Sequence, residues 1–261
     1  MKVVVCVKQV PEPGEVKVNR ETRTLIKDGV NLMINPFDSY AIEEGLRIKE
    51  KTGGTLTTVC MGEAKAQEAL RETVALGADQ AVLLSDPSFA DSDTLATAHV
   101  LAKGLSKLDG FDLIILGKQA IDGQSAQVGP SLAEELGIPH LTQVRKIADL
   151  KDGYAKVERL LEGGVETAET SLPALITVVK EINEPRLPSL KGIMKAKKTE
   201  IANWNAAALG VDPSRGGQAG SPTSVVEVNL PPARPKGEIL GGELSEQVSA
   251  MVQRIRETKI V

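Results

Sequence analysis

The first half of the chain alternates short apolar runs with longer amphipathic segments. The apolar runs are residues 2–7, 54–61, 80–86 and 111–117. Their apolar residues are consecutive rather than alternating, which predicts strands buried on both faces, as in a parallel sheet. Strands that alternate this regularly with helices predict right-handed crossovers. The fold class is therefore α/β, with a doubly wound and mostly parallel sheet.

Three helices are predicted between these strands. The first begins near Asn35, which suits the N-cap position, with Pro36 as its first helical residue. The second lies within residues 64–78 and the third within residues 91–108. The inward stripe expected on the third helix consists of Leu95, Ala98, Leu101 and Leu105. His99 lies beside this stripe, and we expect a partly exposed helix residue there rather than a ligand.

Two stretches interrupt the alternation of strand and helix. Residues 15–29 carry alternating segments around a polar turn, which predicts a hairpin inserted after the first strand. Residues 141–172 also alternate and predict an antiparallel excursion. The apolar run at residues 173–182 is then expected to return to the main sheet.

The last third of the chain changes character at about Pro185, from which point half of the 14 prolines lie. Residues 210–224 are rich in Gly, Ser and Pro and are expected to form a linker with little capacity to pack. Residues 224–230 are a candidate strand, and residues 241–260 predict a closing helix. The apolar stripe of that helix consists of Leu244, Val248, Met251, Val252 and Ile255. This stripe must be buried either on the chain's own domain or on a partner, and the extended tail favours a partner.

Composition excludes several classes of protein. Lys and Arg number 31 against 35 Asp and Glu, and aromatic residues make up 2% of the chain. This balance argues against a nucleic-acid binder. No apolar run approaches the ~20 residues of a membrane span, and no targeting segment precedes the first strand. We therefore expect no membrane insertion and a cytoplasmic, prokaryotic location. Cys6 and Cys60 lack metal-ligand spacing and are interpreted as small buried hydrophobes.

A ligand site is expected at one edge of the sheet, because open α/β sheets bind ligands beyond the carboxyl ends of their strands. The first strand ends there at Cys6, Val7 and Lys8. The other strand ends and the helix start that should meet there contribute Asn35, Asp38, Cys60, Met61, Gly62 and Gly117. No Ser–His–acid set accompanies them, so we name no catalytic residue.

The stretch at residues 117–137 runs from a buried strand through small polar residues into an amphipathic helix. Gly123 and Gly129 would let the main chain approach a ligand closely. Asp122 is a candidate acceptor for ribose hydroxyls or loop amides. The neutral hydrogen-bonding side chains are Gln124, Ser125 and Gln127. A helix that begins between Ser125 and Pro130 would present unpaired amides to a phosphate. An ordinary polar loop with a helix cap is the alternative interpretation.

Several separated motifs resemble one family. The segment "NEPRLPSLKGIMKAKKTEI" (183–201) resembles the signature of the electron transfer flavoprotein beta subunit, and "GKQAIDGQSAQVGP" (117–130) resembles its nucleotide loop. The segments "CVKQVPEPGEVKVN" (6–19) and "INPFDSYAIEEGLRIKE" (34–50) are similar to its amino-terminal half. This similarity extends from the start of the chain to about Ile201.

The resemblance implies an adenine-nucleotide-alpha-hydrolase-like, Rossmann-like sheet and a heterodimer with an alpha subunit that carries an FAD. It implies a nucleotide domain at residues 1–184, followed at 185–261 by a recognition loop and an arm that contact partners. The nucleotide-binding positions that it implies are Cys6, Asn35, Asp38, Met61, Ala120, Ile121, Asp122, Gly123, Gln124, Ser125, Gln127, Val128, Gly129 and Pro130. The recognition loop would dock on an acyl-CoA-type dehydrogenase through Leu190, with Arg186 and Lys195 as further contacts. A solvated face, or contact with the alpha subunit, is the alternative for the lysine cluster.

The nucleotide itself is the open question. In ordinary members the loop is more like Ala-Ile-Asp-Asp-Asp-Cys-Asn-Gln-Thr-Gly-Gln, and the site holds a structural AMP. This chain has Gly123 and Pro130 instead, and resembles the electron-bifurcating members, whose beta site holds a second FAD. That resemblance implies NADH as electron donor and ferredoxin or flavodoxin as an acceptor. The alternative is a non-bifurcating carrier with AMP in the same site.

Overall fold

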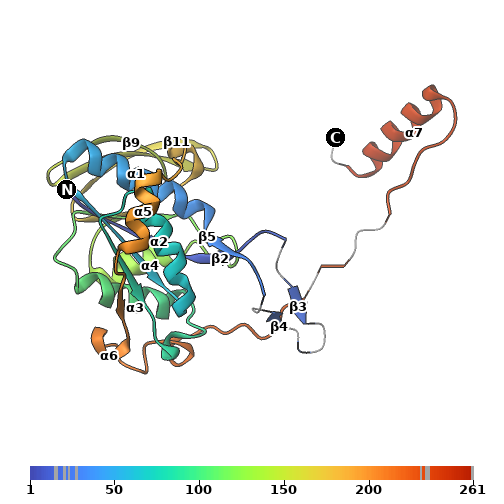
Figure 1. Cartoon of the computed structure of the whole chain (residues 1–261). Helices are drawn as coiled ribbons and strands as arrows, with labels where there is room; N and C mark the ends of the chain where they lie inside the picture. The colour runs from blue at the N-terminus through green and yellow to red at the C-terminus, as the bar shows by residue number, and fades with distance from the viewer. Residues whose placement is uncertain are drawn as a thin grey trace.

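A computed structural model describes residues 1–14, 17–19, 22, 24–26, 29–229, 231–232 and 236–259. Its centre is a nine-stranded sheet in the order β11-β10-β9-β12-β8-β1-β6-β7-β13 (Figure 1). The strands are β1 (Lys2–Val7), β6 (Thr55–Met61), β7 (Gln80–Leu84), β8 (Leu113–Gly117), β9 (His140–Lys151), β10 (Tyr154–Leu161), β11 (Gly164–Ser171), β12 (Ala174–Val178) and β13 (Ala202–Trp204). Neighbours from β9 through to β13 pair in parallel, whereas β10 and β11 are antiparallel. The predicted mostly parallel sheet is confirmed.

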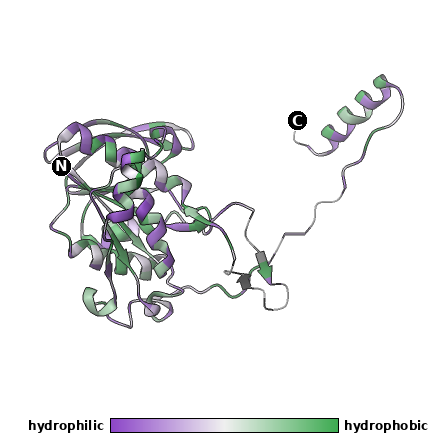
Figure 2. Cartoon of the chain, in the orientation of Figure 1, coloured by the Kyte–Doolittle hydropathy of each residue, from purple (hydrophilic) through white to green (hydrophobic). Residues whose placement is uncertain are grey.

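Helices cover both faces of the sheet. One hydrophobic cluster joins the strands to α1 (Pro36–Thr52) and α2 (Gln67–Leu76), and a second joins them to α3 (Thr94–Ser106) and α4 (Val128–Leu136). Successive residues of β1 divide between the clusters, with Val5 in the first and Cys6 in the second. The consecutive apolar residues are therefore buried on both sides, as predicted. Figure 2 shows the hydrophobic strands enclosed by helices with hydrophilic outer faces.

The insertion after β1 contains two antiparallel pairs. β2 (Gln9–Pro11) pairs with β5 (Leu32–Ile34), and β3 (Lys17–Asn19) pairs with β4 (Thr24–Ile26). The second pair confirms the hairpin predicted at 15–29; the other residues predicted there, 15–16, 20–21, 23 and 27–28, lie outside the described part. The excursion through β9, β10 and β11 and the return in β12 are also confirmed.

The prediction for α3 is wrong at two residues. Leu95 is 45% exposed, although Ala98, Leu101 and Leu105 are buried as predicted. Leu95 precedes the exposed Ser106 by eleven residues, or three helical turns, so the two share the solvent side of the helix. His99 was expected to be partly exposed but is 4% exposed, because α4 packs on that side and brings Glu135 to its ring.

The linker prediction for residues 210–224 is also wrong, because this segment packs on the body. Val211 is buried, and the Gly217 amide donates to Ser92 Oγ (3.1 Å). Gly217 has φ +58°, and a Cβ there would collide with the Ser88 carbonyl oxygen, so only glycine fits this approach. The strand predicted at 224–230 is absent from 224–229, and Leu230 lies outside the described part. Neither Val225 nor Val226 is buried there.

The remaining helices are α5 (Leu190–Lys198), α6 (Ala206–Leu209) and α7 (Leu244–Glu257). α7 stands apart from the sheet at the end of an extended chain (Figure 1). None of its residues is buried, and its predicted apolar stripe is exposed along its whole length. The closing helix is therefore confirmed, with an apolar face that the chain itself leaves uncovered.

Candidate functional site

Asp38 joins three elements at the carboxyl edge of the sheet. Its Oδ2 accepts a hydrogen bond from the Lys8 amide (2.8 Å), directly after β1, and its Oδ1 accepts one from the Gly117 amide (3.1 Å), at the end of β8. The side chain lies in the first turn of α1 and is buried. A Cβ on Gly117 would stand 2.5 Å from Asp38 Oδ1, so this junction requires glycine. The predicted convergence of strand ends and helix start is confirmed.

Asn35 fixes the loop that follows β8. It is the N-cap residue of α1 by position, but its side chain makes no capping hydrogen bond. Instead Nδ2 donates to the Gln119 carbonyl (3.0 Å) and Oδ1 accepts from the Ile121 amide (3.1 Å). Its own amide donates to the Lys8 carbonyl (2.8 Å). Asn35, at the start of α1, thus holds the loop after β8 in place. The preference of Asn for the N-cap position does not by itself predict these contacts.

The loop itself offers main-chain donors. Gln124 and Ala126 have positive φ values of 50° and 55°, and Gln127, which follows, is right-handed. A change of hand between successive residues is the backbone arrangement of anion-binding nests. α4 begins at Val128, and the amides of a first helical turn have no partner within the helix. A Cβ on Gly129 would lie 2.5 Å from Thr177 Cγ2, so glycine lets this helix start pack closely on β12.

An ion pair links Lys8, directly after β1, to Asp122 in the loop after β8. Lys8 Nζ lies 2.9 and 2.7 Å from the two carboxylate oxygens of Asp122. The side chains are 49% and 29% exposed, so water screens the attraction in part. The pair ties the loop to the end of β1 and neutralises its acidic side chain. The sequence placed Lys8 at the end of the first strand, at this edge, but did not predict its pairing with Asp122.

Burial raises the pKa of three groups near this edge of the sheet, Asp38, Cys6 and Cys60. Burial raises the pKa of Asp38 to about 7, against the opposing effects of its hydrogen bonds and of Lys8. Burial, with the nearby Asp38 charge, also raises the pKa of the Cys6 thiol, and burial raises that of Cys60 to about 12. Both cysteines are free and buried, in agreement with their interpretation as small hydrophobes. Neither has the depressed pKa of a nucleophilic thiol.

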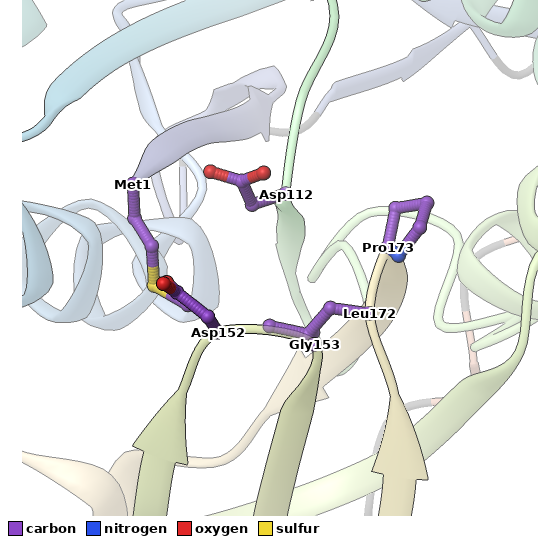
Figure 3. A pocket seen from close by; sticks show the side chains of 6 residues that line it. All are labelled: Met1, Asp112, Asp152, Gly153, Leu172 and Pro173. Carbon is purple, nitrogen blue, oxygen red and sulfur yellow. The ribbon is translucent and has the colours of Figure 1, made fainter.

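A separate shallow pocket lies at the opposite edge of the sheet (Figure 3). Its lining residues precede β1, β8 and β12 or lie in the β9–β10 turn, and they are Met1, Asp112, Asp152, Gly153, Leu172 and Pro173. This is the amino edge of the parallel strands, away from the loop after β8. Within the described residues there is neither a group of His, Cys, Asp and Glu suited to a metal ion nor a helix able to span a membrane.

Known proteins are similar to this chain in sequence. Residues 22–209 match the electron transfer flavoprotein domain. The chain is 45% identical over 262 residues to the electron transfer flavoprotein subunit beta of Thermoanaerobacterium thermosaccharolyticum, with 100% of both chains covered. This chain belongs to the electron transfer flavoprotein family, as a beta subunit.

Two further proteins are similar to this beta subunit over most of its length. It is 42% identical over 263 residues to the caffeyl-CoA reductase-Etf complex subunit CarD of Acetobacterium woodii, with 100% of both chains covered. It is 44% identical over 242 residues to protein FixA of Azotobacter vinelandii, with 90% of this chain and 86% of FixA covered. Beta subunits of this family serve electron transfer and pair with an alpha subunit.

The residues at the carboxyl edge fit a phosphate-bearing cofactor of this flavoprotein family. The loop supplies amides and small side chains, and nothing lies within 4 Å of the position that a Cβ on Gly123 would take. The one acidic side chain of residues 117–130 is already paired with Lys8. A phosphate requires hydrogen-bond donors with no unpaired carboxylate beside them, and this loop meets that requirement.

The predicted site residues of the beta subunit fall into two groups. The strand ends, the helix start and the loop come together at one edge, where Asp38 and Asn35 hold Gly117 and the residues after it. Leu190 and Lys195 lie elsewhere, in α5, and Arg186 lies on the chain that leads into that helix. Leu190 is 83% exposed, whereas the Arg186 guanidinium is bound within the chain by Glu43 and Glu50. These remain candidates for partner binding.

Proposed function

We propose that this beta subunit holds a second FAD at the carboxyl edge of its sheet and works in flavin-based electron bifurcation. An FAD bound there would supply the two-electron oxidation of NADH and one-electron transfer to ferredoxin or flavodoxin and, through the alpha-subunit FAD, to an acyl-CoA-type dehydrogenase. The chain's own residues bind and orient this cofactor. None of them is assigned a catalytic role.

The observation that carries the choice of FAD over AMP is the loop at residues 122–130. Gly123 stands where ordinary members of the family have an acidic residue, and the space beside it is open. Pro130 replaces a polar residue at the far end of the same stretch. Less charge and less side-chain bulk along the loop suit a dinucleotide that continues towards the alpha subunit. The likeness to CarD, named as part of a caffeyl-CoA reductase complex, supports this choice.

Each part of the edge has a distinct role in this proposal. The amides at the start of α4 and the turn around Ala126 bind the pyrophosphate. Asp38 and Asn35 do not reach the cofactor as donors; they fix the loop in the conformation that presents those amides. Lys8 holds the Asp122 carboxylate beside the phosphate path and offsets its charge. A cradle fixed before binding costs less ordering when the cofactor arrives.

Two exposed apolar surfaces serve the partners. The stripe on α7 docks on the alpha subunit, and the segment around Leu190 docks on the dehydrogenase. The name of the CarD complex, a caffeyl-CoA reductase complex, supports a dehydrogenase that acts on CoA thioesters. Lys195 is a further candidate contact on the same helix. The complex acts in the prokaryotic cytoplasm, where NADH and ferredoxin are available.

A coupled assay tests this function. The purified heterodimer is given NADH, ferredoxin and a short-chain acyl-CoA dehydrogenase, with or without its enoyl-CoA substrate. We expect ferredoxin reduction only when the enoyl-CoA is also present, because the favourable transfer drives the unfavourable one. Reduction of the dehydrogenase by NADH that neither requires nor accompanies ferredoxin reduction would contradict bifurcation and favour the simple carrier.

A further inference from the structure

The segment at residues 183–199, which we call the docking segment, is held against the body at both ends. We propose that Arg186 and Arg71 are positioning residues that fix its exposed leucine face in one orientation for the dehydrogenase. This inference rests on the proposed function, in which that face meets an acyl-CoA-type dehydrogenase. It assigns Arg186 to the chain's own structure rather than to the partner.

The face itself is apolar and uncovered. Leu187, Leu190 and Met194 are 89%, 83% and 64% exposed. Leu190 and Met194 are four residues apart and share one side of α5, and Leu187 lies in the irregular chain just before that helix. Exposed apolar groups in such a cluster mark a protein–protein contact, and a few large side chains dominate its affinity. Their contribution to the affinity for the partner depends on how firmly the chain fixes their position.

The first clamp fastens the start of the docking segment to α1. Arg186 Nε donates to Glu43 Oε2 (2.8 Å) and Nη2 donates to Glu50 Oε2 (3.1 Å), so one planar guanidinium bridges two carboxylates. The Glu43 side chain is only 4% exposed and also binds Arg47. Asn183 Nδ2 adds a hydrogen bond to the Tyr40 carbonyl (3.0 Å). A buried, doubly bonded carboxylate makes this a rigid attachment rather than a surface ion pair.

The second clamp fastens the end of the segment to α2. Arg71 Nη1 donates to the carbonyls of Ala196 (2.9 Å) and Thr199 (3.1 Å), which closes the last turn of α5. Gly192 faces the Ala75 carbonyl so closely that a Cβ would collide with it. Lys195 Nζ donates to the Ala78 carbonyl (3.3 Å), so it too is used within the chain. The leucines between the clamps therefore project from a segment that has little freedom to move.

A face fixed in this way binds without first being ordered, which lowers the cost of association. α1 also carries Asn35 and Asp38 at its amino end. One helix thus orients both the cofactor loop and the docking segment. The arrangement sets the position of the dehydrogenase relative to the cofactor edge of this subunit.

Substitutions in the alpha–beta complex separate anchoring from positioning. The variants Arg186→Gln, Arg71→Gln and Gly192→Ala are compared with Leu190→Ala, using a purified short-chain acyl-CoA dehydrogenase as electron acceptor. Each positioning variant should raise the KM for the dehydrogenase about tenfold, as loss of preorganisation predicts. The kcat at saturation, the FAD content and NADH-driven dye reduction should not change. Arg186→Lys should restore only part of the loss, because a lysine cannot bridge both carboxylates.

Two controls complete the design. Gly163→Ala makes the same chemical change in the β10–β11 turn, where nothing lies within 4 Å of the added Cβ, and should leave the KM unchanged. If Arg186→Gln fails to fold, Glu50→Gln removes the exposed half of the first clamp instead. Amide hydrogen exchange of the docking segment, measured without dehydrogenase, should accelerate in every positioning variant.

The outcomes distinguish the inference from the proposed function. An unchanged KM in Leu190→Ala, or no transfer from the wild type to the dehydrogenase, would overturn the docking proposed above. A raised KM in Leu190→Ala, with an unchanged KM and unchanged amide exchange in the positioning variants, would overturn the positioning role alone.

Discussion

At the scale of residues, a buried carboxylate organises the cofactor edge at an energetic cost. Asp38 receives the amides of Lys8 and Gly117 and so joins β1, β8 and α1. The same burial raises its pKa to about 7. The folded protein therefore holds the proton of Asp38 more tightly than the unfolded chain does. The amides of Lys8 and Gly117 require a hydrogen-bond acceptor at this position, but ionisation of the Asp38 carboxyl group opposes folding.

Asp38→Asn tests this balance. Since the folded-state pKa is raised, the stability contributed by Asp38 is full below about pH 3.8 and is lost as the pH rises through about 7. Asparagine keeps one acceptor but turns an amide NH₂ group towards a main-chain donor, at a cost of about 1–3 kcal/mol. The free energy of unfolding should thus be lower in the variant at pH 5, with a smaller deficit at pH 8. Denaturant titrations at both values measure it; a deficit that does not change would contradict the pKa shift.

At the scale of elements, the sequence predicted correctly those strands and helices that depend on residues close together in the chain. β1 and β8 follow from consecutive apolar residues, and α1 follows from Asn35 and Pro36. The misjudged parts depend on contacts distant in sequence. His99 is buried because α4 covers it, and residues 211–223 pack because Arg215 reaches Glu135 and Gly217 fits against residues 88–92. In the site, Asp38 and Gly117 were predicted from the helix start and the strand end, but the hydrogen bonds from the Lys8 and Gly117 amides to the Asp38 carboxylate were not.

Glu135 is the centre of the packing that holds residues 211–223. It accepts a hydrogen bond from Arg215 Nη2 (2.6 Å) and lies 2.9 Å from His99 Nδ1. Burial alone would raise the pKa of Glu135, but His99 and Arg215 outweigh it and lower the pKa. The Glu135 contribution to stability is therefore present above the ordinary carboxylate range and is lost as the pH falls through the lowered pKa.

Glu135→Gln should release this segment from the body. The free energy of unfolding should fall by about 1–3 kcal/mol at pH 7, because a buried imidazole loses its charged partner. Trypsin should then cut at Arg215, which the ion pair protects in the wild type. Glu134→Gln is the matched control, since Glu134 is the exposed neighbour on the same helix. Equal cleavage rates in the two variants would show that Glu135 does not hold the segment.

At the scale of the whole molecule, the chain consists of a packed α/β body and a helix, α7, that the rest of the chain does not cover. α7 has no buried residue, yet its stripe from Leu244 to Ile255 is apolar along its length. A subunit of a heterodimer accounts for this surface, and it lies apart from the docking segment on α5. In the proposed function, the cofactor edge, the dehydrogenase face and the alpha-subunit helix are three separate parts of one chain.

The identity of the nucleotide at the carboxyl edge tests the central claim most directly. The heterodimer is purified with its alpha subunit and denatured, and the released FAD and AMP are quantified against protein. The open, charge-paired loop around Gly123 predicts two FAD per heterodimer and no AMP. One FAD with one AMP would contradict the account and make this chain the structural subunit of a simple electron carrier.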